Sequence, residues 1–461
     1  MSTYAKPRVP DWHKNATLYE VNLRHYTPEG TIKAFSAHLP RLKQMGVDIL
    51  WFMPLHPVSK KKRKGELGSP YAAAHYTHIN PLFGTDRDFR NLLQQVRLLG
   101  MHTIIDWIPN HTGWDHPWIT DHPDWYLQDD HGNIIDPVNP YSGESWGWTD
   151  VAALNYSSRE MRNAMIAAMR YWVEEVGVDG FRVDVAHGVP FDFWEECTDV
   201  LYAIKPLFML AEAEVPELLN SGCFVMDYGW DMHKLLRRIA KYKGATRREG
   251  PQLVQGNLQQ SEAESINRET HACDIDKLLA VRDSRYHRGY QMYFTSNHDE
   301  NAWSGTAYEW FGEGHEAFAV LTATFSGMPL LYSGMESAID KQFRFFTKDE
   351  IDWGDFRHAA FYEALFKLKH RNKALWNGSH GGKLVKIITG QDRDIYAFSR
   401  EKEGDRVVVL INLSSHHHTI HLDLHLEEGP YYSLFTGDKA DFRREQTFLL
   451  VPWDYRVFSN R

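Results

Sequence analysis

The sequence predicts a (β/α)8 TIM barrel joined to an all-β domain, and three observations carry this prediction. Eight short apolar runs, rich in β-forming residues, recur before residue 373. Amphipathic helical stretches lie between many of these runs, and strand and helix alternating eight times is the pattern of such a barrel. After Lys373 the pattern changes to short alternating strands, which favours a β-sandwich.

The eight apolar runs are the predicted strands of the barrel. They are almost continuously apolar, as expected when both faces of a parallel strand are buried. In chain order they cover 17–23, 48–55, 102–108, 179–185, 207–213, 223–229, 291–297 and 329–334. Three stretches between them have apolar residues at helical spacing and are predicted helices: 31–46, 87–100 and 159–177.

Two interruptions break the regular spacing. Residues 113–154 contain Gly, Asp, His, Pro and Trp without a helical period and are too long for a plain connection, so they predict a short excursion subdomain after the third strand. A polar insert at 245–288 is expected to be helical in parts. The predicted domains are the barrel in two parts, the excursion between them and a C-terminal β-sandwich: 1–112, 155–372, 113–154 and 373–461.

The composition and charge of the chain indicate which classes of binding partner and which location to expect. A net charge of −10 over 461 residues disfavours general binding to nucleic acid or to an anionic membrane. The basic run SKKKRKG at 59–65 is isolated and is predicted to be a solvated loop. Three sparse cysteines, no signal-peptide pattern and no apolar stretch of membrane-spanning length lead us to expect a cytoplasmic protein.

Acidic side chains gather where the predicted strands end, which is the rim where a barrel carries its chemistry. Side chains alternate along a strand, so Arg182 and Asp184 point to the same face. Several buried like charges are costly unless they are paired. The polar residues at the ends of strands three, four, five and seven are Asp106, Asn110, His111, Arg182, Asp184, Glu212, Glu214, Asn297, His298 and Asp299.

Glycoside hydrolysis or transfer fits such a set of residues. The reaction uses one carboxylate as nucleophile and one carboxylic acid as proton donor. The acid needs a pKa raised by burial or by a neighbouring negative charge, and the nucleophile needs a cation that keeps it ionised. Arg182 beside Asp184 provides that cation.

Four motifs in order resemble the signatures of glycoside hydrolase family 13, the α-amylase family. They are DWIPNH on strand three, GFRVD on strand four, LAEAE on strand five and NHDE on strand seven. The resemblance covers about residues 15–372. It implies that Asp184 is the nucleophile, Glu212 the general acid/base and Asp299, with His298, the group that stabilises the transition state.

Weaker matches imply further roles. The stretch SPYAAAHYTHINPLFGT (69–85) is similar to the family's loop after strand two, whose tyrosine, here Tyr71, stacks on the reacting sugar. DVAALNY (150–156) resembles the motif that closes the excursion. His111 and His298 are expected to donate to sugar hydroxyls, and His187 falls where the family lines the aglycone side.

Several alternatives stay open on the sequence. Asp106 and Asn110 are interpreted as structural residues that shape the turn after strand three and the joint with the excursion. Glu214 competes with Glu212 for the role of the acid, because both lie on one face of an extended chain, although the family pattern favours Glu212. Glu300, beside Asp299, is expected to lie outside the first layer of contacts.

No cofactor is expected to be required, and calcium is the one metal left open. Many relatives bind it through an asparagine that corresponds to Asn110. Others use an acidic loop after strand one, but RHYTPEGT at 24–31 lacks those acids. The acids of DDHGNIID at 129–136 are better explained by a hairpin turn.

The sequence therefore predicts a retaining α-glucan hydrolase of the α-amylase or maltodextrin hydrolase type. Starch or short maltodextrins are its expected substrates and partners, and the oligomeric state is not readable. An exo-acting α-glucosidase, a glucan transferase, and a sucrose- or trehalose-converting enzyme use the same catalytic residues and remain alternatives. A catalytically dead scaffold is a remote alternative, because all three acids are present.

Overall fold

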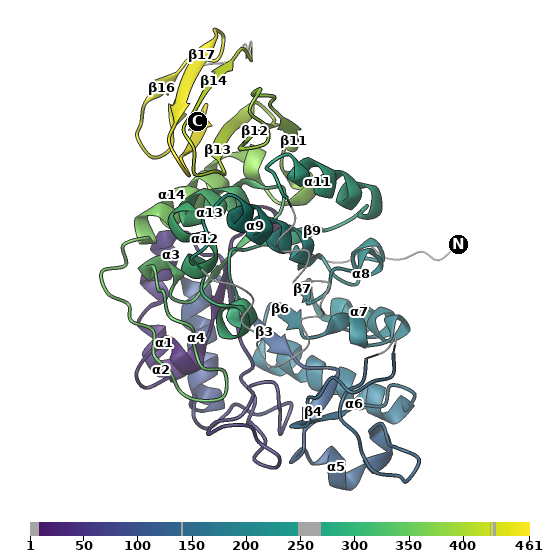
Figure 1. The fold of residues 1–461 in the computed structure, drawn as a ribbon. Coiled ribbons are helices and arrows are strands. Elements are labelled where there is room, and N and C mark those ends of the chain that lie inside the picture. Colours follow the sequence, from purple (N-terminus) through teal and green to yellow (C-terminus); the bar gives the residue numbers. More distant parts are fainter. Residues whose placement is uncertain (1–8, 140–141, 248–268, 425, 427–429) are drawn as a thin grey trace.

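The fold is described from a computed structural model of the 461-residue chain. The described residues are 9–139, 142–247, 269–424, 426 and 430–461. Figure 1 shows a barrel with the C-terminal domain at one end of the molecule and the excursion, with β4 and α5, at the opposite end.

Eight parallel strands close into a barrel, as the sequence predicts. Going round the ring, the order is β1, β10, β9, β8, β7, β6, β3 and β2. Each strand falls on a predicted apolar run: β1 (Leu18–Val21), β2 (Ile49–Phe52), β3 (His102–Trp107), β6 (Gly180–Val183), β7 (Phe208–Ala211), β8 (Met226–Tyr228), β9 (Tyr290–Tyr293) and β10 (Met328–Tyr332). The strands are buried on both faces, which explains why the runs are nearly continuously apolar.

The helices surround the barrel and pack their apolar faces on it. The long ones are α4 (Asp86–Leu98), α6 (Arg159–Tyr171), α7 (Phe191–Ile204), α9 (Trp230–Tyr242), α11 (Asp274–Arg285), α13 (His315–Thr324) and α14 (Ala359–Arg371). The shorter ones are α1 (Leu23–Tyr26), α2 (Ile32–Ser36), α3 (Leu39–Met45), α5 (Trp118–Asp121), α8 (Pro216–Asn220) and α12 (Ala307–Phe311).

Two predicted helices differ from the observed ones for local reasons. The stretch 31–46 is split into α2 and α3, and Pro40 occupies the first turn of α3, where a missing N–H costs nothing. The stretch 159–177 is α6 followed by a π-helical turn, Trp172–Val176, that ends at the left-handed Gly177.

The excursion leaves and re-enters the barrel through one antiparallel ribbon. Strand β4 (His111–Gly113) pairs with β5 (Val151–Ala153), so residues far apart in the sequence lie side by side. A Cβ on Gly113 would lie 2.6 Å from the Ala72 carbonyl oxygen, which explains the glycine at this close approach. The ribbon holds the excursion against the rim of the barrel.

The C-terminal domain is a sandwich of a six-stranded and a two-stranded sheet. The larger sheet has the order β11 (Lys383–Lys386), β12 (Ile395–Lys402), β13 (Asp405–Asn412), β18 (Tyr455–Ser459), β15 (Tyr431–Ser433) and β16 (Lys439–Ala440). The smaller sheet pairs β14 (His418–Leu422) with β17 (Gln446–Leu450). Strands β17 and β18 are separated by a turn in which Trp453 is left-handed.

Buried Arg400 joins this domain to the barrel. Its guanidinium donates to the carbonyl oxygens of Thr324 and Phe325, at the end of α13, at 3.0 and 2.7 Å.

In the insert 245–288, α11 is the helical part that the structure shows, and 248–268 lie outside the described residues. None of the described helices is long and apolar enough to cross a bilayer.

Candidate active site

The candidate site lies at the carboxyl ends of the barrel strands, and a buried arginine is its centre. Arg182, on β6, has no exposed surface. Its Nη1 donates to Asp106 Oδ1 and to Asp184 Oδ1, each at 2.9 Å. Its Nη2 lies 2.8 Å from Glu212 Oε1, an ion pair without the alignment of a hydrogen bond. One guanidinium therefore contacts three carboxylates from three different strand ends.

Aromatic side chains complete the surroundings of Arg182. Its Nε donates to the Tyr228 hydroxyl at 3.0 Å, and its guanidinium lies 5.1 Å from the centre of the Trp51 ring. Arginine suits such surroundings better than lysine does, because its guanidinium is planar, weakly hydrated and able to stack on aromatic rings. The packing fixes the guanidinium, so the carboxylates it contacts are held in fixed positions.

Asp106 is part of the cluster around Arg182. The sequence suggested only a structural residue that shapes the turn after strand three. Its Oδ2 accepts hydrogen bonds from Trp51 Nε1 at 3.2 Å and from the Tyr71 hydroxyl at 3.0 Å. Burial raises the pKa of Asp106 to about 6, although Arg182 acts in the opposite direction. Asp106 thus ties Arg182 to Tyr71 and orients both.

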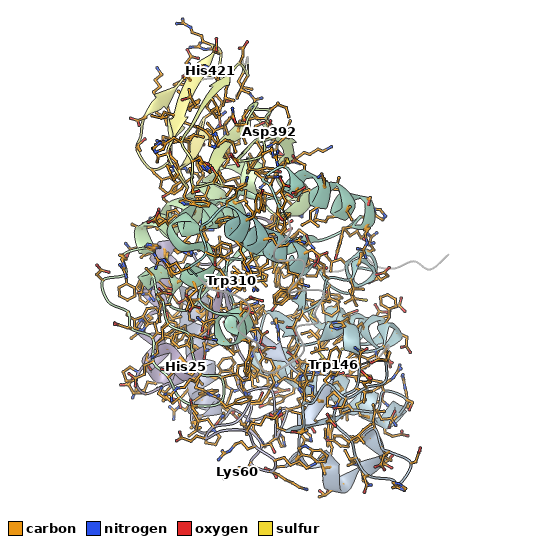
Figure 2. All side chains as sticks on the ribbon, in the orientation of Figure 1. His25, Lys60, Trp146, Trp310, Asp392 and His421 are labelled. Atoms are coloured by element: carbon orange, nitrogen blue, oxygen red, sulfur yellow. The ribbon has the colours of Figure 1, made fainter. Side chains whose placement is uncertain are left out.

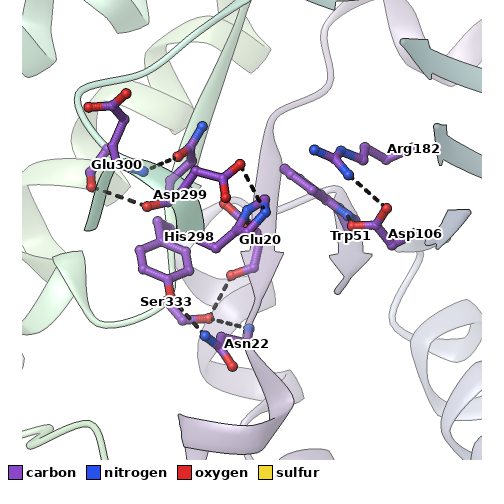
Figure 3. A network of polar contacts seen from close by, with 12 residues as sticks. Glu20, Asn22, Trp51, Asp106, Arg182, His298, Asp299, Glu300 and Ser333 are labelled. Carbon is purple, nitrogen blue, oxygen red and sulfur yellow. Dashed lines mark hydrogen bonds and ion pairs between the residues drawn. The ribbon is translucent and has the colours of Figure 1, made fainter. Parts of the chain in front are cut away.

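His298 connects the other half of the site (Figure 3). Its Nδ1 lies 2.5 Å from Glu20 Oε1, and its Nε2 lies 2.7 Å from the Tyr71 hydroxyl and 3.2 Å from Asp299 Oδ2. Burial disfavours the charged ring, but the carboxylates of Asp299 and Glu20 outweigh it and raise the pKa of His298 to about 9. The ring is therefore a cation that donates from both nitrogens at neutral pH.

The pKa values of Asp184 and Glu212 are shifted in opposite directions, and the shift of Glu212 differs from the expectation. Burial and the neighbouring Glu212 raise the pKa of Asp184 well above its usual range. Burial also acts on Glu212, but Arg182 and the Val185 N–H, 2.8 Å from Glu212 Oε2, outweigh it and lower the pKa of Glu212. The sequence predicts a raised pKa for Glu212, but it cannot show that Arg182 reaches both carboxylates.

Val185 has an unusual backbone. Its φ of 42° and ψ of 45° place a β-branched residue in the left-handed region, which strains such residues. The conformation turns its N–H toward Glu212. Strain next to a charged cluster is typical of functional sites.

Two acids that stand beside the predicted catalytic acids in the sequence, Glu214 and Glu300, lie away from Arg182 in the structure. β7 ends at Ala211, so Glu212 and Glu214 are not on one extended face. Glu214 Oε1 instead accepts from Gln291 Nε2 at 3.0 Å, away from Arg182. Glu300 contacts Arg237 at 2.6 Å, which places it outside the Arg182 cluster, as expected.

The remaining predicted residues occupy the rim. His111, on β4, is buried, and burial lowers its pKa to about 4, so it is neutral at pH 7. The carbonyl oxygen of Asn110 accepts from Leu154 N at 3.1 Å and thereby joins the barrel to the end of the excursion. His187 is exposed in a 3₁₀ turn, Ala186–Gly188.

A cavity of about 850 Å³ opens above the cluster. Asp184, Glu212, Asp299, Tyr71 and His111 all line it. Aromatic rings form its sides: Trp146 stacks on Trp148 with ring centres 5.5 Å apart, and Trp303, Phe345 and Phe346 lie on other loops. Three of the predicted acids and the predicted tyrosine therefore face one common space.

Calcium binding through Asn110 stays a prediction. The Asn110 amide contacts His111 Nδ1 at 3.4 Å, and the Asp129 carboxylate accepts from the His131 and Asn133 N–H groups in the hairpin turn. Across the described residues, no group of three or more His, Cys, Asp or Glu side chains is arranged to hold a metal.

Three contributors to the site were missed by the sequence analysis. Glu20 lies in the middle of β1, Tyr228 ends β8, and Lys64 comes from the basic run and lines the cavity. The sequence signal that could have identified Glu20 is that it is a lone acid in an apolar strand. Most of the basic run is exposed as predicted, but Lys64 contacts Asp150 at 2.9 Å.

Two family models match most of the chain. Residues 10–382 match the family model "Alpha amylase, catalytic domain", and residues 388–458 match "Alpha amylase, C-terminal all-beta domain". The crystal structure of a noncanonic maltogenic alpha-amylase AmyB from Thermotoga neapolitana superposes with a TM-score of 0.80 at 25% identity, covering 97% of this chain and 98% of that one.

Two sequence relatives illustrate the range of similar proteins. The alpha-amylase MalA of Haloarcula japonica is 24% identical over 90% of this chain, which spans 58% of that relative's length. An alpha-1,4-glucan:maltose-1-phosphate maltosyltransferase of Rhodospirillum rubrum is 34% identical over 43% of this chain, which spans 31% of that relative. With both family models matched, the chain belongs to the α-amylase family, glycoside hydrolase family 13.

Proposed function

We propose that this protein is a retaining α-glucan hydrolase that cleaves α-1,4-glucosidic bonds by double displacement. The observation that carries the proposal is the contact of Arg182 with both Asp184 and Glu212. Because one guanidinium contacts both carboxylates, they lie close together. Retaining enzymes place the two carboxyls close together, whereas inverting enzymes leave room for a water molecule.

In the first step, Asp184 attacks the anomeric carbon while Glu212 protonates the glycosidic oxygen, which leaves with the aglycone. In the second step, Glu212 removes a proton from water, and the water displaces Asp184 with the α configuration retained. Asp299 and the His298 cation bind the hydroxyls of the distorted sugar. Tyr71, held by Asp106, lies against the sugar face.

The reaction needs a protonated Glu212 and an ionised Asp184, whereas the surroundings raise the pKa of Asp184 and lower that of Glu212. A sugar whose glycosidic oxygen accepts a hydrogen bond from Glu212 stabilises the protonated form of Glu212, so binding itself prepares the acid.

The first experiment is time-resolved proton NMR on maltoheptaose. Short products released first as α-anomers support a retaining hydrolase, whereas β-anomers contradict retention. Longer chains would identify a transferase. Glu212→Gln should lower kcat by about 10²–10⁴-fold, the usual contribution of a positioned acid–base group. Glu214→Gln is the matched control, because its side chain faces Gln291 and should leave the rate unchanged.

Azide trapping assigns the two carboxyls separately. With an α-glycosyl fluoride, Asp184→Ala should let azide attack the anomeric carbon directly and give the β-azide. Glu212→Ala should still form the glycosyl-enzyme and give the α-azide. The reverse pattern would exchange the two roles and contradict the assignment.

The location proposed with this function is the cytoplasm. Cys197, Cys223 and Cys273 are all free thiols. Free thiols are stable in a reducing compartment, which supports this location. The expected substrates there are maltodextrins or starch.

A further inference from the structure

The proposed roles fix the direction in which a glucan crosses the site. Glu212 follows β7 and protonates the oxygen that leaves, so the aglycone lies on the β7 side. In the closed ring of strands, β1 stands opposite β7. The glycone therefore extends toward the loops that follow β10, β1 and β2, which are residues 333–358, 22–31 and 53–85.

Buried Arg24 joins these three loops. It lies in α1, directly after β1, and its Nη1 donates to the Gly68 carbonyl oxygen at 3.0 Å and to the Phe345 carbonyl oxygen at 2.9 Å. Lys348 in turn donates to the Arg24 carbonyl oxygen at 2.8 Å. Charge-assisted hydrogen bonds of this kind are about twice as strong as neutral ones. The loops after β10 and β2 are thus fixed to the segment after β1.

The loops after β2 and β10 also contact each other directly. The N–H of Leu67 donates to the Phe346 carbonyl oxygen at 2.9 Å. A Cβ on Gly65, where φ is 64°, would lie 2.6 Å from Phe346 Cβ. The two loops therefore meet without a gap, and Phe345 and Phe346 face the cavity at this seam.

Lys64 extends the wall to the excursion. Its Nζ lies 2.9 Å from Asp150 Oδ1 and 3.3 Å from the Gly147 carbonyl oxygen. Asp150 is buried, so this ion pair is less screened by solvent than one at the surface. Lys64 and Asp150 both line the cavity and close the space between the β2 loop and the excursion.

The wall continues on its other side to the loop after β9. Asn301 accepts from Phe343 N at 2.9 Å and donates to the Lys341 carbonyl oxygen at 3.0 Å. The Trp303 ring lies 5.0 Å from that of Phe345. Bonded loops thus surround the glycone half of the site from the excursion to β9.

The aglycone half has a much lower rim. Only residues 184–190 separate β6 from α7, and only 212–215 separate β7 from α8. Between β8 and α9 there is a single residue, Gly229. The cavity is accordingly walled at the glycone end and bordered by short loops at the aglycone end, and its volume of about 850 Å³ is in the range that holds one small ligand.

We propose that this wall makes the enzyme exo-acting: it accepts the non-reducing end of a maltooligosaccharide and releases a short product of fixed length. The inference rests on the proposed function and selects the mode of action within it. A glucan that continued beyond the wall would have to displace the Lys64–Asp150 and Leu67–Phe346 contacts. An interior segment of a long chain is therefore excluded.

The test compares two p-nitrophenyl maltoheptaosides, one free and one with an ethylidene group on its non-reducing end. The blocked substrate should react at least about 100-fold more slowly, equivalent to about 2.7 kcal/mol of transition-state binding. Unblocked maltoheptaose should give one short product from the first time point. Equal rates on both substrates would overturn the exo mode, whereas no turnover of either would overturn the proposed hydrolase itself.

A pair of lysine variants tests the wall directly. Lys64→Ala removes the bridge to Asp150 and should raise the rate on the blocked substrate relative to the free one by about tenfold, the effect of 1.4 kcal/mol. Lys60→Ala is the matched control, because its exposed side chain lies at the outer edge of the molecule (Figure 2). An unchanged ratio in Lys64→Ala, with the circular dichroism spectrum of the wild type, would show that this bridge does not limit the substrate.

Discussion

Glu20 Oε1 lies 2.5 Å from His298 Nδ1, with both side chains almost completely buried. Glu20 is on β1 and His298 follows β9, and only β10 lies between these two strands in the ring, so the contact bridges the end of β10. On its other nitrogen, His298 meets Tyr71 and Asp299. Glu20 is thus a positioning residue that keeps a histidine cation directed at the sugar site.

Replacing Glu20 by Gln should move the alkaline limb of activity to lower pH. The pKa of His298 is about 9 because Asp299 and Glu20 outweigh burial, and the variant keeps only one of these carboxylates. The cation is then lost at a lower pH, so kcat/KM should fall earlier as the pH rises. A pH profile measures this, with Glu336→Gln, a buried carboxylate that contacts Arg41 instead, as the control. An unmoved alkaline limb would contradict the role of Glu20.

The same histidine makes stability depend on pH. Its folded pKa of about 9 exceeds its ordinary value of 6.5, so its contribution is fully present below pH 6.5. That contribution is lost as the pH rises through about 9. Urea unfolding of the wild type and His298→Gln should therefore differ most below pH 6.5 and converge above pH 9. A gap that widened with rising pH would contradict this.

Glu300 should show the opposite dependence. Burial is outweighed by Arg237 and His233, and the pKa of Glu300 falls to about 2 from its ordinary 4.5. Its contribution is present above pH 4.5 and is lost as the pH falls through about 2. Glu300→Gln should lower the free energy of unfolding at pH 7 by about 2 kcal/mol, the scale of a hydrogen bond to a charged group. The difference from the wild type should shrink in acid, as measured by urea unfolding at several pH values.

Arg182→Met should be strongly destabilising as well as inactive. Removing the cation leaves Asp106, Asp184 and Glu212 buried without their shared partner. Breaking a buried ion pair costs about 3–5 kcal/mol. Arg159→Met, whose exposed side chain pairs with Glu196, should cost no more than about 1 kcal/mol. Equal effects in urea unfolding would mean that Arg182 is not needed to hold the three acids.

Val185→Asn should stabilise the fold. Val185 is β-branched and left-handed, and such strain costs on the order of 1–3 kcal/mol. Asparagine tolerates this conformation and keeps the N–H that Glu212 accepts. Val185→Ala shortens the side chain without this tolerance and should be less stable than Val185→Asn. A reversed order in thermal unfolding would remove backbone strain as the explanation.

The barrel could be predicted because each strand is a short run buried on both faces. β3, β6 and β7 also begin the motifs that carry Asp106, Arg182 and Glu212, so the sequence indicated that these side chains converge. The identity of the contacts could not be predicted. That Arg182 reaches Glu212 as well as Asp184 depends on the tilt of neighbouring strands, and this contact lowers the pKa of Glu212.

Local sequence patterns could not predict contacts between side chains that lie far apart in the sequence. Glu300 contacts Arg237 across a separation of 63 residues, and Lys64 reaches Asp150 from a run that is otherwise solvated. The spacing within 59–65 predicts a loop but not the neighbour that the loop meets. Glu214 was separated from Glu212 only by the end of β7, a boundary that sequence patterns locate to within a few residues.

The β4–β5 ribbon is where the excursion leaves and re-enters the barrel. Gly113 and Val151 face each other across it, so the segment between them can change length or sequence while the barrel strands keep their register. The aromatic side of the cavity, Trp146 and Trp148, belongs to that segment, whereas the three acids belong to the barrel. Exchanging residues 114–150 between related chains would therefore transplant substrate preference as a module and leave the bond-breaking apparatus in place.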